Sequence, residues 1–165
     1  MYIADKDEQY LPALPPTNSE PRVEQTERTF IAWDMMYPWG ITGIAMVKME
    51  YGGLNLYTLR KYTDWMWSGP FDISNDNIMT LMNWLSKDTH SNQGEESLSN
   101  SVDDEISYQR IMFWQGDSGF GILRLNNDLG FELSSIAAGL RRGGAKINFE
   151  DGMKLESWLS ILPHG

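Results

Sequence analysis

Few residues in this sequence are able to perform acid–base or nucleophilic chemistry. The chain contains no cysteine and only two histidines. His90 lies in a polar segment and His164 is the penultimate residue, so neither is placed like the rigid, oriented imidazole that a general base requires. Carboxylates remain, and Asp34, Asp64 and Asp117 are the candidates for a hydrolase that works with paired acids.

Residues 116–119 read Gly-Asp-Ser-Gly, which resembles the nucleophile motif of chymotrypsin-like proteases. Phe120 and Gly121 stand where that motif continues with Gly-Pro, and no histidine upstream is suitably placed. A glycine turn between two strands explains these residues, with Asp117 and Ser118 at its corner. We therefore expect no serine protease site.

No pattern typical of a metal or cofactor site is present. Without cysteine there is no thiolate ligand for zinc or an iron–sulfur cluster. Asp72, Ser74 and Asp76 have the alternate spacing of a calcium loop, but its glycine and final glutamate are replaced by Asn77 and Asn83. We found no phosphate-binding glycine loop. We expect neither a metal nor a cofactor.

Arg141, Arg142 and Lys146 form the only basic cluster. Residues 134–142 begin with a serine and end in the two arginines before two glycines, a pattern that predicts a short helix. In that interpretation the arginines complement the negative end of the helix dipole. A local contact with a phosphate or carboxylate is the alternative.

The formal net charge is −10, and half of it lies in one segment. Residues 87–107 contain six acids and one base, whereas residues 108–165 contain six of each. Such a balance argues against direct binding to nucleic acid, where cationic side chains must neutralise phosphates. It favours a basic protein partner, such as a nucleic-acid-binding protein, and a solubilising surface is the alternative.

Hydrophobic residues make up 41% of the chain, enough for one domain or two small halves that share a core. No apolar run approaches the roughly 18–20 residues that a membrane-spanning helix needs. The first ten residues are acidic, unlike a signal peptide. We expect a soluble, cytoplasmic protein.

Two segments resemble each other, and each has the pattern of an amphipathic helix after a strand. Ile73–Ser86 and Ile147–Ser160 align without a gap, and the identical pairs include Trp84 with Trp158. One interpretation is a repeat of two β-rich halves, each closed by a helix. Chance similarity between two core-facing helices is the alternative.

We predict an α+β fold with mainly antiparallel sheets and two or three helices packed on one side. An arrangement of two similar β-β-α halves fits this class. Proline-rich residues 1–28 are predicted as an extended arm, with Tyr10, Leu11 and Leu14 as anchors if it docks. The first half spans 29–87, an acidic mobile loop spans 88–107, and the second half spans 108–165.

The aromatic residues are the remaining candidates for binding. Trp65 and Trp67 lie on one side of a predicted short strand that ends before Ser68-Gly-Pro70, and Trp39 precedes them in a turn. At a sheet edge such tryptophans are interface candidates, and a place in the core is the alternative.

We therefore predict a small, acidic, non-catalytic protein that binds and occludes a basic protein partner. Phage-type inhibitors of nucleic-acid-binding defence enzymes and toxin immunity proteins are the classes it fits. The steering residues predicted are Glu95, Glu96, Asp103, Asp104 and Glu105, and the contact residues are Trp39, Trp65 and Trp67. The alternatives are a structural subunit that uses its N-terminal arm and a carboxylate hydrolase; a homo-oligomer is also compatible with the sequence.

Overall fold

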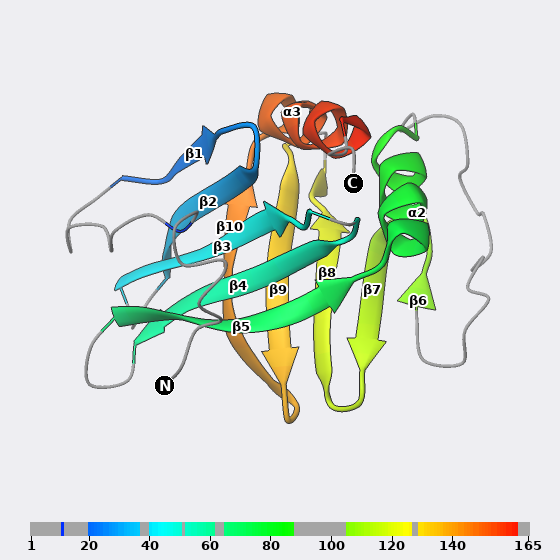
Figure 1. The fold of residues 1–165 in the computed structure, drawn as a ribbon. Coiled ribbons are helices and arrows are strands. Elements are labelled where there is room, and N and C mark those ends of the chain that lie inside the picture. The colour runs from blue at the N-terminus through cyan, green and yellow to red at the C-terminus, as the bar shows by residue number, and fades with distance from the viewer. Residues whose placement is uncertain are drawn as a thin grey trace.

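The chain folds into two antiparallel sheets and two helices (Figure 1). The structure is a computed structural model. It describes Leu11 and residues 20–36, 40–50, 52–61, 65–87, 105–126 and 129–161.

The first half is a five-stranded meander followed by a helix. Each strand pairs antiparallel with the next along the chain, in the order β1-β2-β3-β4-β5. The elements are β1 (Arg22–Gln25), β2 (Thr29–Met36), β3 (Gly40–Lys48), β4 (Leu54–Lys61), β5 (Trp65–Ile73) and α2 (Asn75–Leu85).

The second half repeats this plan, with the sheet order β10-β9-β8-β7-β6 and a helix after the last strand. The α+β class with mainly antiparallel sheets is thereby confirmed. The elements are β6 (Glu105–Ile106), β7 (Arg110–Gln115), β8 (Ser118–Arg124), β9 (Phe131–Ala137), β10 (Leu140–Ile147) and α3 (Phe149–Ser160).

Two predictions of local structure were wrong. Residues 134–142 form no helix, because they belong to a hairpin between β9 and β10. Its two-residue loop is Ala138-Gly139, and both have positive φ (+52° and +76°), as a type I′ turn requires. The arginines of the basic cluster therefore lie on a strand. The strand at Trp65 does not end before Ser68, because β5 continues to Ile73.

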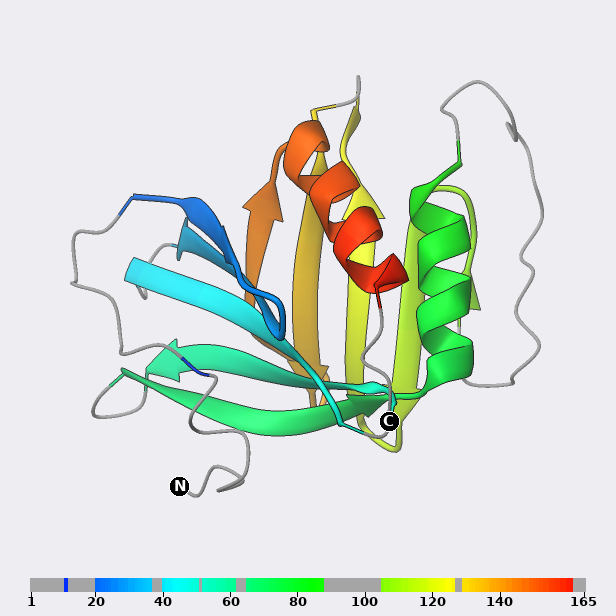
Figure 2. The ribbon, with the colours of Figure 1, turned by 45° about the horizontal axis from the view of Figure 1, so that its top comes forward.

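The two sheets pack face to face, and the strands of one run across those of the other (Figure 1). β10 crosses and contacts β2, β3 and β4 of the first sheet. The main hydrophobic core lies between the sheets and beneath the helices, which contact each other (Figure 2). This arrangement resembles orthogonal sheet packing, in which the inner faces supply the core.

Both helices are fixed at their N-termini by a polar cap. Ser74 Oγ accepts a hydrogen bond from Asn77 N (3.2 Å), and Asn148 Oδ1 accepts one from Asp151 N (2.7 Å). Such caps satisfy backbone N–H groups that a helix start leaves unpaired.

The two tryptophans of the sequence repeat make the same hydrogen bond in each half. Trp84 Nε1 donates to the carbonyl of Ser107 (2.6 Å), in the turn between β6 and β7. Trp158 Nε1 donates to the carbonyl of Thr26 (3.0 Å), in the turn between β1 and β2. Each helix is thus tied to the first hairpin of one sheet, α2 to the second sheet and α3 to the first.

A buried cation lies against each of these tryptophans. The Arg124 guanidinium lies 4.2 Å from the ring centre of Trp84 and donates to that residue's carbonyl. Lys48 Nζ lies 4.5 Å from the ring of Trp158 and donates to the carbonyl of Ile161, just after α3. Burial lowers the pKa of Lys48. Cations at the carbonyl-rich end of a helix, over an aromatic ring, are favourably placed.

The turn before the fourth strand of each half also matches. Gly53 and Gly130 both have positive φ (+82° and +134°). A Cβ at either position would press on a backbone carbonyl, that of Ile73 or of Ile147. The sequence similarity therefore belongs to a structural repeat that extends over strands, turns, caps and helices.

The first sheet is also buried on its outer face. A second cluster lies there, and Trp33 and Trp67 pack within it with ring centres 5.3 Å apart. Leu11 packs against this cluster, as predicted for an anchor of the N-terminal arm. Most of that arm lies outside the described residues, and its last part, Arg22–Gln25, is strand β1. None of the described helices is long and apolar enough to cross a membrane.

Candidate functional site

Three of the predicted partner-binding residues lie in the described part of the chain. Trp65 is half-buried and Trp67 is 3% exposed, and both pack in the cluster on the outer face of the first sheet. Glu105 is exposed at the start of β6. The others lie outside the described residues: Trp39, Glu95, Glu96, Asp103 and Asp104.

The structure does not bring the described members of this set to one surface. Trp65 and Trp67 lie at the beginning of β5, at the end of the first sheet away from the helices (Figures 1 and 2). Glu105 lies in β6, at the opposite side of the molecule and beside α2. The described tryptophans of the predicted set, Trp65 and Trp67, and its described acid, Glu105, therefore lie on opposite sides of the molecule.

The carboxylates proposed for hydrolysis have other surroundings. Asp34 Oδ1 accepts a hydrogen bond from Met35 N (2.7 Å), and its Oδ2 accepts one from Lys146 N (2.8 Å). Asp34 thereby joins β2 to β10 across the two sheets. Asp117 is exposed in the two-residue turn between β7 and β8, and Asp64 lies outside the described residues. No group of three or more potential metal ligands occurs among the described residues.

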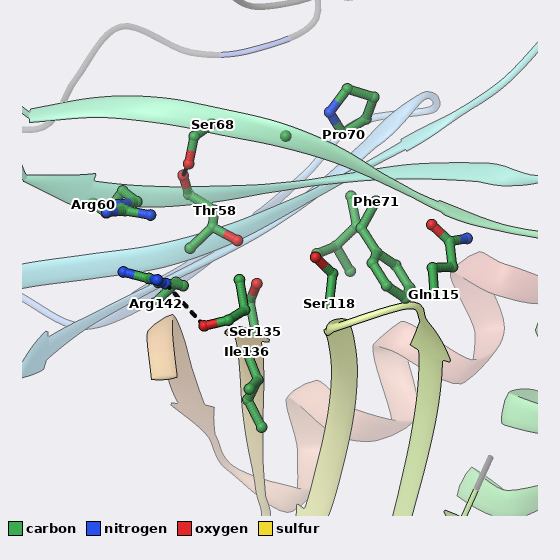
Figure 3. Close-up of a pocket in the computed structure, with 13 residues that line it drawn as sticks. Thr58, Arg60, Ser68, Pro70, Phe71, Gln115, Ser118, Ser135, Ile136 and Arg142 are labelled. Atoms are coloured by element: carbon green, nitrogen blue, oxygen red, sulfur yellow. Dashed lines mark hydrogen bonds between the residues drawn. The ribbon is translucent and has the colours of Figure 1, made fainter. Parts of the chain in front are cut away.

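A cleft of about 200 Å³ opens between the two sheets (Figure 3). Apolar residues form part of its wall, among them Phe71 and Pro70 of β5 and Ile136 of β9. The rest is polar and comes from both halves of the chain. The polar side chains are Thr58, Arg60, Ser68, Gln115, Ser118, Ser135 and Arg142.

A bulge in each sheet borders this space. In β5, Gly69 and Pro70 oppose a single residue of β4, between two regular pairs. In β10, Arg142 is the extra residue, because Arg141 pairs with Ile136 and Gly143 pairs with Ser135. Bulges bend a strand and redirect the side chain at the bulge. Each half therefore has a bulge in its last strand, and both bulges line the cleft.

The two arginines lie at the same end of the cleft in Figure 3, and Gln115 lies at the other. Arg142 Nε donates to the carbonyl of Ala137 (3.3 Å), which holds the side chain across the hairpin. Ser68 Oγ donates to the carbonyl of Thr58 (3.4 Å). No carboxylate is among the described residues that line the cleft.

The charge of the described part differs from that of the whole chain. The described residues include 13 acids and 12 bases, so they contribute −1 to the net charge of −10. The other −9 belongs to residues outside the described ranges, and five of those charges fall in 88–104.

The sequence indicates the cleft only weakly. It marked Arg142 as part of a basic cluster for which a phosphate or carboxylate contact was the alternative, but it gave no sign that Arg60 would lie nearby. The two arginines are separated by more than half of the described chain, and sheet packing brings them to one cleft.

Comparison with protein-family models, curated proteins and solved structures finds no match to this chain. Function must therefore be argued from the geometry and the charges.

Proposed function

We propose that this protein acts without catalysis, by binding and occluding a basic protein partner through its acidic segment, residues 87–107. The partner class is a nucleic-acid-binding protein, as for a phage-type inhibitor of a defence enzyme or a toxin immunity protein. The observation that supports the proposal is the separation of charge: a nearly neutral described body and a segment that carries six acids and one base.

Concentrated negative charge accelerates encounter with a cationic surface and disfavours nucleic acid as a direct ligand. Spread evenly over the surface, the same charge would serve solubility alone. The segment instead concentrates a net charge of −5 in 21 residues, which is half of the net charge of the chain.

Both ends of the segment adjoin a rigid part of the fold. Trp84, near the end of α2, donates a hydrogen bond to the carbonyl of Ser107. Arg124 donates hydrogen bonds to the carbonyls of Trp84 and Tyr108. The segment therefore leaves and rejoins the body at one buried cluster. Glu105, at its C-terminal end, pairs with Arg110 on the neighbouring strand (3.2 Å).

A charge-neutralised variant tests the proposal. The segment variant carries amides at Glu95, Glu96, Asp103, Asp104 and Glu105. The control variant has the same change of net charge, made at five exposed acids elsewhere: Glu20, Glu27, Glu50, Asp72 and Glu150. Each variant and the wild type is used to capture partners from the native host lysate at low and high salt.

We expect the wild type and the control to retain a basic protein that elutes as salt rises, and the segment variant to lose it. With the isolated partner, the association rate of the segment variant should fall by about 10-fold or more, and less at high salt. Equal loss in both variants, or a partner that remains bound to the segment variant, would contradict the proposal.

The assembly-subunit alternative is tested by truncation. Leu11, which was predicted as an anchor of the arm, packs on the sheet of its own chain. Removing residues 1–19 leaves β1 intact, and an inhibitor would keep its partner. A subunit that needs the arm would instead fail to enter its assembly.

A further inference from the structure

The cleft between the sheets has a composition unlike the rest of this acidic chain. It combines two arginines with four hydroxyl groups and one amide, and no carboxylate is among its described lining residues. Arg22, Arg110 and Arg141 each lie beside a glutamate. Arg142 forms no ion pair with any carboxylate of the described residues.

The backbone places Arg142 in the cleft. It is the extra residue of a bulge in β10, where the neighbouring residues keep their pairing with β9. Its Nε donates a hydrogen bond to the carbonyl of Ala137, which fixes the guanidinium relative to the hairpin. A guanidinium held in this way loses less conformational freedom when it binds an anion.

The hydroxyl groups come from both sheets. Thr58 and Ser68 lie on β4 and β5, whereas Ser118 and Ser135 lie on β8 and β9 (Figure 3). Hydroxyls donate hydrogen bonds to anionic oxygens, and two guanidiniums at one end supply charge and a planar fork of donors. An anion at a partly enclosed site is stabilised by cations beside it, and Arg60 and Arg142 both line this end of the cleft.

We propose that this cleft binds the phosphate group of a small molecule, with Arg60 and Arg142 as the charged donors. The apolar body of the ligand lies toward Phe71 and Pro70. A phosphate has more anionic oxygens to accept from two guanidiniums and several hydroxyls than a carboxylate has. This proposal does not depend on the acidic segment, which lies in another part of the chain.

The size of the cleft limits the ligand. About 200 Å³ is less than the roughly 300–1,000 Å³ of a site for a drug-sized molecule. It is several times the roughly 30 Å³ that one water occupies in the liquid. Inorganic phosphate or a phosphate monoester with a small apolar group is the matching size class, whereas a nucleotide would extend out of the cleft.

The test measures binding of inorganic phosphate, phenyl phosphate and benzoate to the full chain by calorimetry and by NMR, against potassium chloride at equal ionic strength. We expect the phosphates to bind and to shift the amide signals of Thr58, Ser118 and Ser135. R142Q and R60Q should each weaken the binding by about 10- to 100-fold. R110Q, which changes an exposed arginine outside the cleft, should bind as the wild type does.

Absence of binding by either phosphate, or amide shifts confined to residues outside the cleft, would overturn the proposal. So would equal affinity in R142Q and the wild type. Benzoate binding more tightly than phenyl phosphate would overturn the assignment to phosphate and indicate a carboxylate ligand. If an arginine variant does not fold, the NMR map of the wild type decides the question alone.

Discussion

Replacement of Arg124 by alanine should be among the most destabilising single changes at a charged residue. The side chain is 6% exposed and donates to the backbone carbonyls of Tyr108 and Trp84. Its guanidinium also lies over the rings of both residues, 4.6 Å and 4.2 Å from their centres. R124A removes these contacts together and leaves two inward carbonyls without their charged donor.

The magnitude follows from the contacts. A hydrogen bond to a charged group contributes about 1.5–3 kcal/mol, and a desolvated cation–π contact adds up to about 2 kcal/mol. These terms are not additive, so we expect R124A to lower the free energy of unfolding by about 3–5 kcal/mol. For a chain of this length that corresponds to a fall in Tm of roughly 6–20 °C.

Urea denaturation followed by tryptophan fluorescence measures this loss. The control is R110A, because Arg110 is half-exposed and its pair with Glu105 lies at the surface, where such pairs contribute less than about 1 kcal/mol. R124K tests the equivalence of the halves, since Lys48 occupies the same place beside α3. We expect R124K to recover part of the loss. A stability of R124A within about 1 kcal/mol of the wild type would refute the reasoning.

Three further predictions concern the folded body. Burial lowers the pKa of Lys48 below 10.5, so the folded chain releases that proton before the unfolded chain does. The free energy of unfolding of the wild type, measured relative to K48M, should therefore rise with pH between the lowered pKa and 10.5; a flat difference would contradict this. G130A should lower the free energy of unfolding by about 2–4 kcal/mol, because Gly130 has a positive φ and a Cβ there would meet the carbonyl of Ile147 at the end of β10. G116A lies in an open turn, also at positive φ, and should lower it by about 1–2 kcal/mol. T42V should lower the free energy of unfolding by about 1–3 kcal/mol, because Thr42 Oγ1 accepts a hydrogen bond from the buried Gly144 N (3.0 Å). T42S keeps the hydroxyl and should retain most of the stability. Equal urea midpoints for T42V and T42S would contradict the assigned hydrogen bond.

Local features of the fold were predictable where one physical pattern dominated. The helices were found from apolar spacing, and Ile78, Leu81 and Leu85 of α2 are buried as that spacing requires. The turn at Gly116-Asp117 was found from its glycine. In each case the signal lay within a few residues of the chain.

The hairpin at 134–142 was misread because its ends imitate a helix. Ser134 has the form of an N-cap and Arg141 the form of a residue in a last helical turn. The deciding feature is Ala138-Gly139, where an alanine adopts a positive φ that its propensity disfavours. Pairing of β9 with β10 in the second sheet outweighs that cost, and pairing across a sheet is not visible in a local window.

Burial on both faces of the first sheet was also missed. The run Gly40–Lys48 is buried at nearly every position, as a strand covered on both sides would be, rather than alternating. Trp67 does lie in an edge strand, because β5 is the last strand of the first sheet, but its side chain is not exposed to solvent. Trp33 covers it instead, and Leu11 packs on the same cluster.

The two halves differ in the charged residues that they contribute to the cleft. The pair Leu54–Ile73 corresponds to Phe131–Ile147 at the end of the last strand of each sheet, so Thr58 corresponds to Ser135. Both of those hydroxyl residues line the cleft, as an exact repeat would predict. Two residues further along each strand, β4 has Arg60 where β9 has Ala137. Of the two bulges, only that of β10 carries an arginine. The repeat thus places a hydroxyl at equivalent positions of the fourth strand in both halves, and Arg60 and Arg142 add charge to the cleft at positions that the repeat does not match.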